Sequence, residues 1–252
     1  MFNRRVPRPA GRRRHPAALE LEPRTLLSIA VDIRYDYDIN GLFAAPERRA
    51  VLQAAVNTVA STLGDSLAAI APTATNTWSA SFTDPGTGLT RTIANLVVPA
   101  DTLILYVGGR DLSGTTVGSG GYGGYSSRGT QEWLDTVHAR GQTGALAGVP
   151  TDFGPWGGSI SFDTVGTNFS FGLDPAGIGF NQTDFYSVAM HEFGHVLGMI
   201  SSSSWGRYIS GGVFTGPNAV AAYGGLPVPL AAGGSHWAAG TLSDGAPAAM
   251  TP

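Results

Sequence analysis

The feature that most constrains the fold is an amphipathic stretch, residues 183–198, that carries two histidines four positions apart. Thr183 or Asp184 stands where the N-cap of a helix accepts backbone N–H groups, and Gly198 stands where a helix ends. The apolar residues in this stretch recur at helical spacing, and they are Phe185, Val188, Ala189, Val196 and Leu197. The pattern predicts a helix that buries one face and carries both histidines on one side.

The two histidines, His191 and His195, lie one helical turn apart, so both rings can point at one metal ion. Glu192 is rotated by about 100° around the helix axis, where it misses the ion but reaches a water bound to it. The His-Glu-x-x-His pattern therefore predicts two metal ligands and a general base. The alternative interpretation is a pair of surface histidines on a buried helix.

A catalytic zinc site needs a third protein ligand, because such sites generally provide three and keep a fourth position for water. The chain has no cysteine, so the donor has to be His, Asp or Glu. After His195 the sequence offers His236 and Asp244, and the imidazole is the better zinc donor of the two. Ser201 occupies the position of a third histidine in some zinc motifs, but its neutral hydroxyl is a poor donor.

Upstream of this helix the chain alternates strand-like and helix-like segments. Residues 29–38 alternate as a strand does, and residues 46–70 carry apolar residues at helical spacing behind Pro46. Three β-type runs follow at residues 77–84, 92–98 and 102–112. The third run is apolar enough to lie inside a sheet.

The segment from Gly108 to Gly129 is dominated by glycine, serine and tyrosine, which predicts an irregular loop. Within it, residues 118–123 match the dinucleotide pattern G-x-G-x-x-G, but no helix opens directly behind them, so that site is not favoured. Residues 130–140 predict a short helix. Residues 157–164 alternate as a strand with one solvent-facing side, and little regular patterning follows residue 198.

Charge and hydropathy exclude two classes of partner. Residues 1–24 hold nearly half of the 15 basic residues, yet the net charge is −3, so the rest of the chain is acidic and would repel nucleic acid. No window approaches the roughly 18 apolar residues of a membrane span. We expect residues 1–28 to be a disordered Arg- and Pro-rich leader and residues 29–252 to form one domain of unknown oligomeric state.

A calcium site is a less favoured possibility. Residues 36–47 match the EF-hand calcium loop, and the matching positions are Asp36, Asp38, Asn40, Gly41 and Glu47. An EF-hand has a helix on each side, whereas a strand is predicted ahead of this segment. We therefore expect a strand-to-helix turn in which Gly41 reverses the chain, with Ca²⁺ as the alternative.

The residues around the histidine pair resemble those of metzincin zinc peptidases. Residues 191–198 match the first eight positions of the metzincin zinc motif, and FDT at 162–164 ahead of it is similar to bacterial matrixin-type proteins. Residues 214–237 resemble the segment before the displaced third ligand of leishmanolysin-like proteins. The resemblance implies that His236 is the third ligand and that Met250 belongs to the Met-turn, the loop beneath the metal.

The resemblance also implies a fold and an activity. The fold is α+β and zincin-like, with a twisted, mainly parallel mixed sheet on two main helices (residues 29–198) and an irregular C-terminal subdomain (residues 199–252). The implied activity is a Zn²⁺-dependent endopeptidase acting on protein or peptide substrates, with Glu192 as general base. A substrate would pair with an edge strand that includes Gly158, Ser159, Ile160 and Ser161.

Two further expectations accompany this interpretation. The alternative function is a non-catalytic zinc-binding or adhesive surface module, although such a module would not need the carboxylate of Glu192. Residues 21–28 resemble a short N-terminal segment of many bacterial surface and secreted proteins. That resemblance implies an extracellular or cell-surface location.

Overall fold

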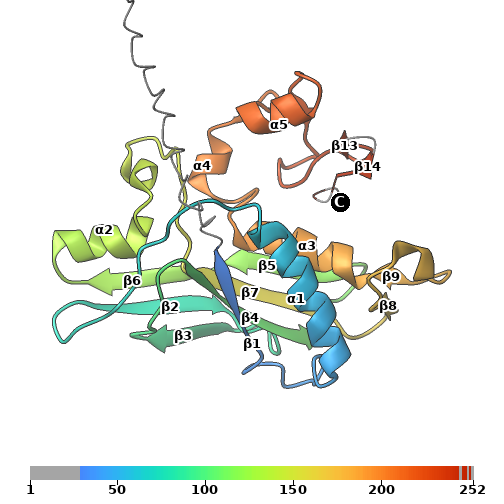
Figure 1. Ribbon diagram of the computed structural model, residues 1–252, viewed down its shortest axis with the longest axis horizontal. Coiled ribbons are helices and arrows are strands. Elements are labelled where there is room, and N and C mark those ends of the chain that lie inside the picture. Colours follow the sequence, from blue (N-terminus) through green and yellow to red (C-terminus); the bar gives the residue numbers. More distant parts are fainter. Residues whose placement is uncertain (1–28, 244–245, 249, 251–252) are drawn as a thin grey trace, which may run out of the picture.

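The computed structural model describes residues 29–243, 246–248 and 250, and shows an α+β chain (Figure 1). The main sheet is mixed, with the spatial order β1 (Ala30–Arg34), β4 (Thr102–Arg110), β7 (Gly157–Asp163) and β5 (Gly118–Tyr122). Its first two pairings are parallel, and the β7–β5 pairing is antiparallel. The predicted leader, residues 1–28, and Asp244 lie outside the described residues.

A second, antiparallel sheet has the order β3 (Thr90–Ala94), β2 (Thr77–Thr83) and β6 (Gly124–Arg128). The helices of the described chain are α1 (Pro46–Ala60), α2 (Gln131–Ala139), α3 (Phe185–Val196), α4 (Ser203–Gly206) and α5 (Pro217–Ala222). None of them has the length and apolar character needed to cross a membrane.

Strand β4 separates two hydrophobic cores. Leu103, Leu105 and Val107 pack in the core beneath α1 and α3, whereas Ile104 and Tyr106 pack in the core shared with the second sheet and α2. Successive strand side chains point to opposite faces, so a strand covered on both sides needs an unbroken apolar sequence. This confirms the prediction that residues 102–112 contain an interior strand.

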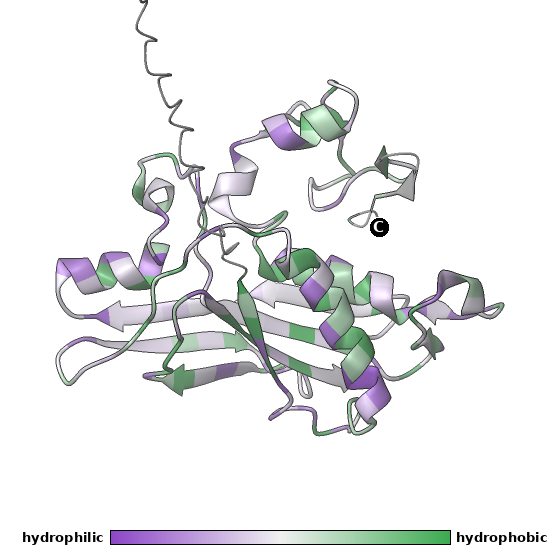
Figure 2. Ribbon diagram, viewed as in Figure 1, coloured by the Kyte–Doolittle hydropathy of each residue, from purple (hydrophilic) through white to green (hydrophobic). Residues whose placement is uncertain are grey.

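Helices α1 and α3 cover one face of the main sheet, and Figure 2 shows polar residues interrupting their apolar colouring. Helix α1 begins at Pro46 as predicted but ends at Ala60 instead of continuing to residue 70. The hydroxyls of Ser61 and Thr62 donate to carbonyls of the last turn. Beyond them Ile70 pairs with Val98, so this segment crosses to the second core.

The prediction of an irregular loop between Gly108 and Gly129 is wrong over its second half, because β5 and β6 lie there. A Cβ atom at Gly118 would lie 2.7 Å from the Glu192 side chain, and one at Gly120 would overlap the Glu192 carbonyl. Gly123, between the two strands, lies directly against the Trp156 ring. These glycines permit close packing, and flexibility is not their role.

The predicted edge strand is also wrong. β7 pairs with β4 on one side and β5 on the other, and all seven of its residues are buried. The backbone of Gly158, Ser159, Ile160 and Ser161 is therefore committed to neighbouring strands. The outer strands of this sheet are β1 and β5.

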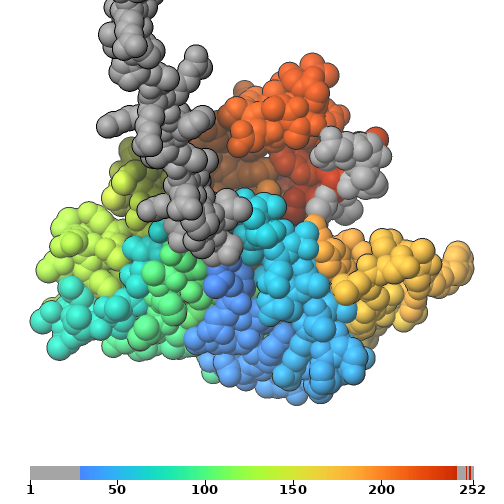
Figure 3. Space-filling view, in the orientation of Figure 1, coloured from blue at the N-terminus to red at the C-terminus, as the bar shows by residue number. Residues whose placement is uncertain are grey.

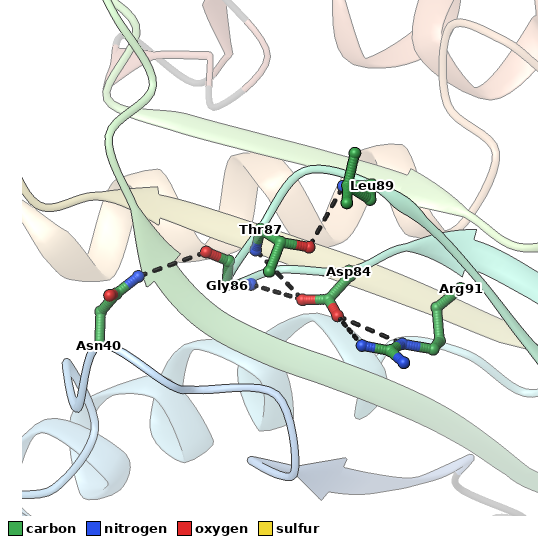
Figure 4. Close-up of polar contacts among 6 residues, drawn as sticks. All are labelled: Asn40, Asp84, Gly86, Thr87, Leu89 and Arg91. Carbon is green, nitrogen blue, oxygen red and sulfur yellow. Dashed lines mark hydrogen bonds and ion pairs between the residues drawn. The ribbon is translucent and has the colours of Figure 1, made fainter.

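The segment that matched a calcium loop is a strand-to-helix turn. The Asp38 carboxylate accepts N–H groups of Leu42 (3.1 Å) and Phe43 (2.7 Å), and Gly41 has φ +67°. Asn40 donates to the carbonyl of Gly86 in the β2–β3 hairpin, where buried Asp84 binds Arg91 and two backbone N–H groups (Figure 4). The Asp38 oxygens thus serve main-chain donors in this fold.

The described residues after 198 form a smaller layer beside α3, coloured orange to red in Figure 3. Apart from α4 and α5, their elements are two-residue strands, of which β10 (Ile209–Ser210), β11 (Val213–Phe214) and β12 (Val228–Pro229) form one sheet. Three aromatic rings pack together, with centroids 4.0 Å apart for Trp205 and Phe214 and 5.2 Å for Trp205 and Trp237.

Candidate metal centre

Helix α3 positions the first two histidines. Its N-cap is Asp184, whose carboxylate accepts the N–H groups of Tyr186 and Ser187, and Gly198 with φ +85° follows its end. The buried face of α3 packs on the main sheet, which fixes its rotation about its own axis. His191 and His195 therefore project from the same side, as predicted from their spacing.

The third histidine, His236, reaches the pair from the C-terminal layer. Its Nε2 atom lies 3.1 Å from His191 Nε2, which in turn lies 3.1 Å from His195 Nε2. One ligand atom from each ring lies within 4.8 Å of the other two. Two nitrogens bound to one zinc ion in tetrahedral geometry are about 3.3 Å apart, so the three residues fit a metal ion.

Backbone contacts around His236 hold it over α3. The Ala231 N–H donates to the His236 carbonyl (2.9 Å), and the Trp237 N–H donates to the Met250 carbonyl (2.8 Å). The adjacent Trp237 ring packs against Trp205 and Phe214. Aromatic packing beside the ligand limits its movement, which a preorganised metal site requires.

Two of the three imidazoles have pKa values lowered by their surroundings. Burial, followed by the proximity of His191, lowers the pKa of His195 to about 4. Burial also lowers the pKa of His236. Since only an unprotonated ring nitrogen coordinates a metal, these shifts favour coordination at neutral pH. The Nδ1 atom of His195 lies 3.4 Å from the Met199 carbonyl, the kind of contact that orients a metal-binding ring.

Met250, the predicted Met-turn residue, lies against α3, the helix that carries His191 and His195. It is buried, and a Cβ atom at Gly194 would be 2.7 Å from its sulfur and 3.1 Å from that of Met199. Gly194 is the residue just before His195. The absence of a side chain there allows both thioethers to approach the helix directly beside the histidine cluster.

The side chain of Glu192 extends from α3 to the edge strand β5. It is 6% exposed, and this burial raises its carboxyl pKa to about 7, while a hydrogen bond from the Gly120 N–H opposes the rise. A carboxylate with this environment is suited to accept and return a proton near neutral pH.

The outer edge of β5 can be deduced from its pairing. The Val117 carbonyl and the Gly123 N–H bond to residues 163 and 157 of the β7 segment. Because backbone groups alternate along a strand, those of Gly118, Gly120 and Tyr122 point away from β7. The Glu192 carboxylate accepts a hydrogen bond from the outward N–H of Gly120, so it lies at the outer edge of β5.

The other candidates have different places. Gly158, Ser159, Ile160 and Ser161 are buried inside the sheet and do not present an edge. Ser201 accepts the Tyr122 hydroxyl at its carbonyl, in keeping with a loop role. Asp244 is outside the described residues. Sequence reasoning missed Gly118 and Gly120, although glycine at every second position is the spacing of one strand face.

Among the described residues, His191, His195 and His236 are the one group of three or more His, Asp or Glu side chains placed to share a metal ion. Comparison with known proteins identifies no relative: no family model, curated protein or solved structure matches the chain.

Proposed function

We propose that this protein is a zinc-dependent endopeptidase with a metzincin-type fold. The observation that carries the proposal is the convergence of three imidazole Nε2 atoms beside a buried glutamate at the free edge of a sheet. The mixed sheet, the two helices on one face and the methionine beneath α3 support the fold assignment. The three-nitrogen donor set supports zinc.

In this proposal His191, His195 and His236 hold the ion, which when bound would polarise the scissile carbonyl and acidify the attacking water. Glu192 accepts the proton released by the water and delivers it to the nitrogen of the leaving amine. The low solvent exposure of Glu192 strengthens its electrostatic interaction with the reacting groups.

Strand β5 takes over the substrate-binding role that the sequence assigned to β7. An extended peptide can pair with the outward backbone groups of Gly118 and Tyr122, which flank the N–H group bound to Glu192. The scissile bond would then lie beside the carboxylate and the histidine cluster. Main-chain pairing of this kind binds many peptide sequences, so side-chain selectivity has to come from elsewhere.

The test combines metal analysis of the purified full chain with a casein hydrolysis assay, with and without a chelator. We expect about one zinc per chain, and hydrolysis that the chelator abolishes and added zinc restores. Glu192→Gln should retain zinc but lower the hydrolysis rate by about a thousandfold or more. Glu47→Gln, a matched change at an exposed glutamate on α1, should alter neither.

Two outcomes would contradict the proposal. If the protein binds zinc but hydrolyses neither casein nor peptides, the non-catalytic zinc-binding module is the better interpretation. If Glu192→Gln hydrolyses casein as fast as the unmodified protein, the assignment of the general base is wrong.

A further inference from the structure

A cavity of about 240 Å³ lies where β5 passes into β6, beyond the Tyr122 end of the edge strand. Four aromatic rings line it, from Tyr122, Tyr125, Phe153 and Trp156. Ser203, at the start of α4, closes it from the C-terminal layer. A cavity of this volume accommodates one large side chain.

The cavity continues the proposed peptide-binding edge. Gly120 bonds to Glu192, and Tyr122 follows two residues later, about 7 Å further along a strand. The Tyr122 hydroxyl donates to the Ser201 carbonyl (3.1 Å), and Phe153 packs against Gly198 at the end of α3. A peptide extended along β5 therefore places a side chain at the cavity two or three residues from the bond beside Glu192.

The polar groups that line the cavity differ in how far their hydrogen bonds within the protein leave them able to bind a ligand. His138 uses both ring nitrogens, one with the Tyr125 hydroxyl and the other with the Ala145 carbonyl. The Trp156 indole donates to the Gly124 carbonyl. Asp152 is the one carboxylate among the lining residues, and its Oδ1 accepts the Phe153 N–H.

The charged guanidinium of Arg140 is buried near this cavity, but its hydrogen bonds go to backbone carbonyls. The Arg140 guanidinium lies behind Pro155 and donates to four backbone carbonyls, those of Ala68, Pro99, Thr102 and Pro155. It is not among the residues that line the cavity. The lining residues are therefore rich in aromatic side chains and include one acidic group.

We propose that this cavity is a specificity subsite for a basic side chain, lysine or arginine, of the substrate peptide. The inference rests on the proposed peptidase function. The long alkyl stem of such a side chain packs on aromatic rings while its cation interacts with ring faces and with the Asp152 carboxylate. An acidic side chain would be repelled by Asp152, and an apolar one would leave that carboxylate without a cationic partner.

The experiment uses zinc-loaded full-length protein and quenched fluorescent peptides that carry lysine at one position within four residues of the cleaved bond. Each peptide is paired with one that carries the uncharged norleucine there. At the subsite position, we expect kcat/KM to be about tenfold higher for lysine. Asp152→Asn should reduce this ratio to about one. Glu132→Gln, at an exposed glutamate of α2, should preserve the ratio.

A ratio near one in the unmodified protein, or a tenfold ratio that persists in Asp152→Asn, would overturn the subsite. If no peptide is cleaved, the peptidase proposal fails, and binding of the same peptides is measured by fluorescence anisotropy. Tighter binding of the lysine peptide that Asp152→Asn removes would still support the subsite. Equal binding of the lysine and norleucine peptides would refute it.

Discussion

The sheet-and-helix part of the chain, residues 29–198, buries its apolar residues in two cores, whereas the described residues after 198 bury few. The buried residues of that later part are Ser202, Phe214, Gly216, Val228, Thr241 and Met250. Its helices and strands are no longer than six residues. Yet both parts supply ligands to the same candidate metal centre, His191 and His195 from the first and His236 from the second.

This difference in burial indicates how the candidate metal site is stabilised. The first two ligands inherit their geometry from a helix that the main core already fixes, so they need no metal to be in place. The third ligand belongs to a layer with little buried apolar surface, and such layers open at low free-energy cost. A metal ion bound by all three would contribute to the stability of the second part far more than to that of the first.

The strongest test of the first part concerns Arg140, whose guanidinium is fully buried and bonded to four carbonyls from three separate segments. Burial lowers its pKa to about 10, so it remains charged at neutral pH. Arg140→Met should lower the free energy of unfolding by about 3 kcal/mol or more, because buried carbonyls lose their donors. Urea denaturation measures this, with exposed Arg128→Met as control. A change equal to that of the control would show that the carbonyls find other donors.

A smaller effect is expected where β5 meets α3. A Cβ atom at Gly120 overlaps the Glu192 carbonyl, whereas one at Gly121 meets nothing within 4 Å. Gly120→Ala should therefore cost about 2 kcal/mol of unfolding free energy and slow peptide hydrolysis, because strand and helix must separate. Gly121→Ala should change stability by less than about 0.5 kcal/mol. Equal effects of the two substitutions on urea denaturation would contradict the close packing.

Some of the fold could be predicted from the sequence because its causes are local. Helix α3 has an N-cap, a regular apolar spacing and a terminating glycine, and β4 is an unbroken apolar run. The glycine-rich segment was predicted to be a loop, but much of it forms strands. Glycine also occurs where a strand packs closely on a helix or on Trp156. β7 was expected to have one solvent-facing side because serines alternate with apolar residues along it, yet Ser159 and Ser161 are buried. Its role as an edge strand was taken from the family resemblance.

The candidate site also has features that the sequence could predict and features that it could not. The convergence of His191 and His195 follows from helical periodicity alone. The position of His236 depends on how the chain packs between His195 and His236, where helices and strands are short. Only counting donors and a family resemblance identified it. No local pattern could show that Gly120 would bond to Glu192, since that contact joins segments far apart in sequence.

The smallest effect on the metal-free protein, and the sharpest test of the comparison, is His236→Ala. Its ring is only partly buried, so unfolding free energy without metal should change by less than about 0.5 kcal/mol. Free zinc at a hundred times the dissociation constant should stabilise the unmodified protein by about 2.7 kcal/mol, and the variant should lose most of this at the same concentration. His138→Ala, a histidine away from the cluster, should keep the zinc-dependent increment. Thermal denaturation with and without zinc measures each increment. If His236→Ala retained the full increment, the two parts of the chain would not be joined through a shared ion, and the third ligand would have to be sought elsewhere.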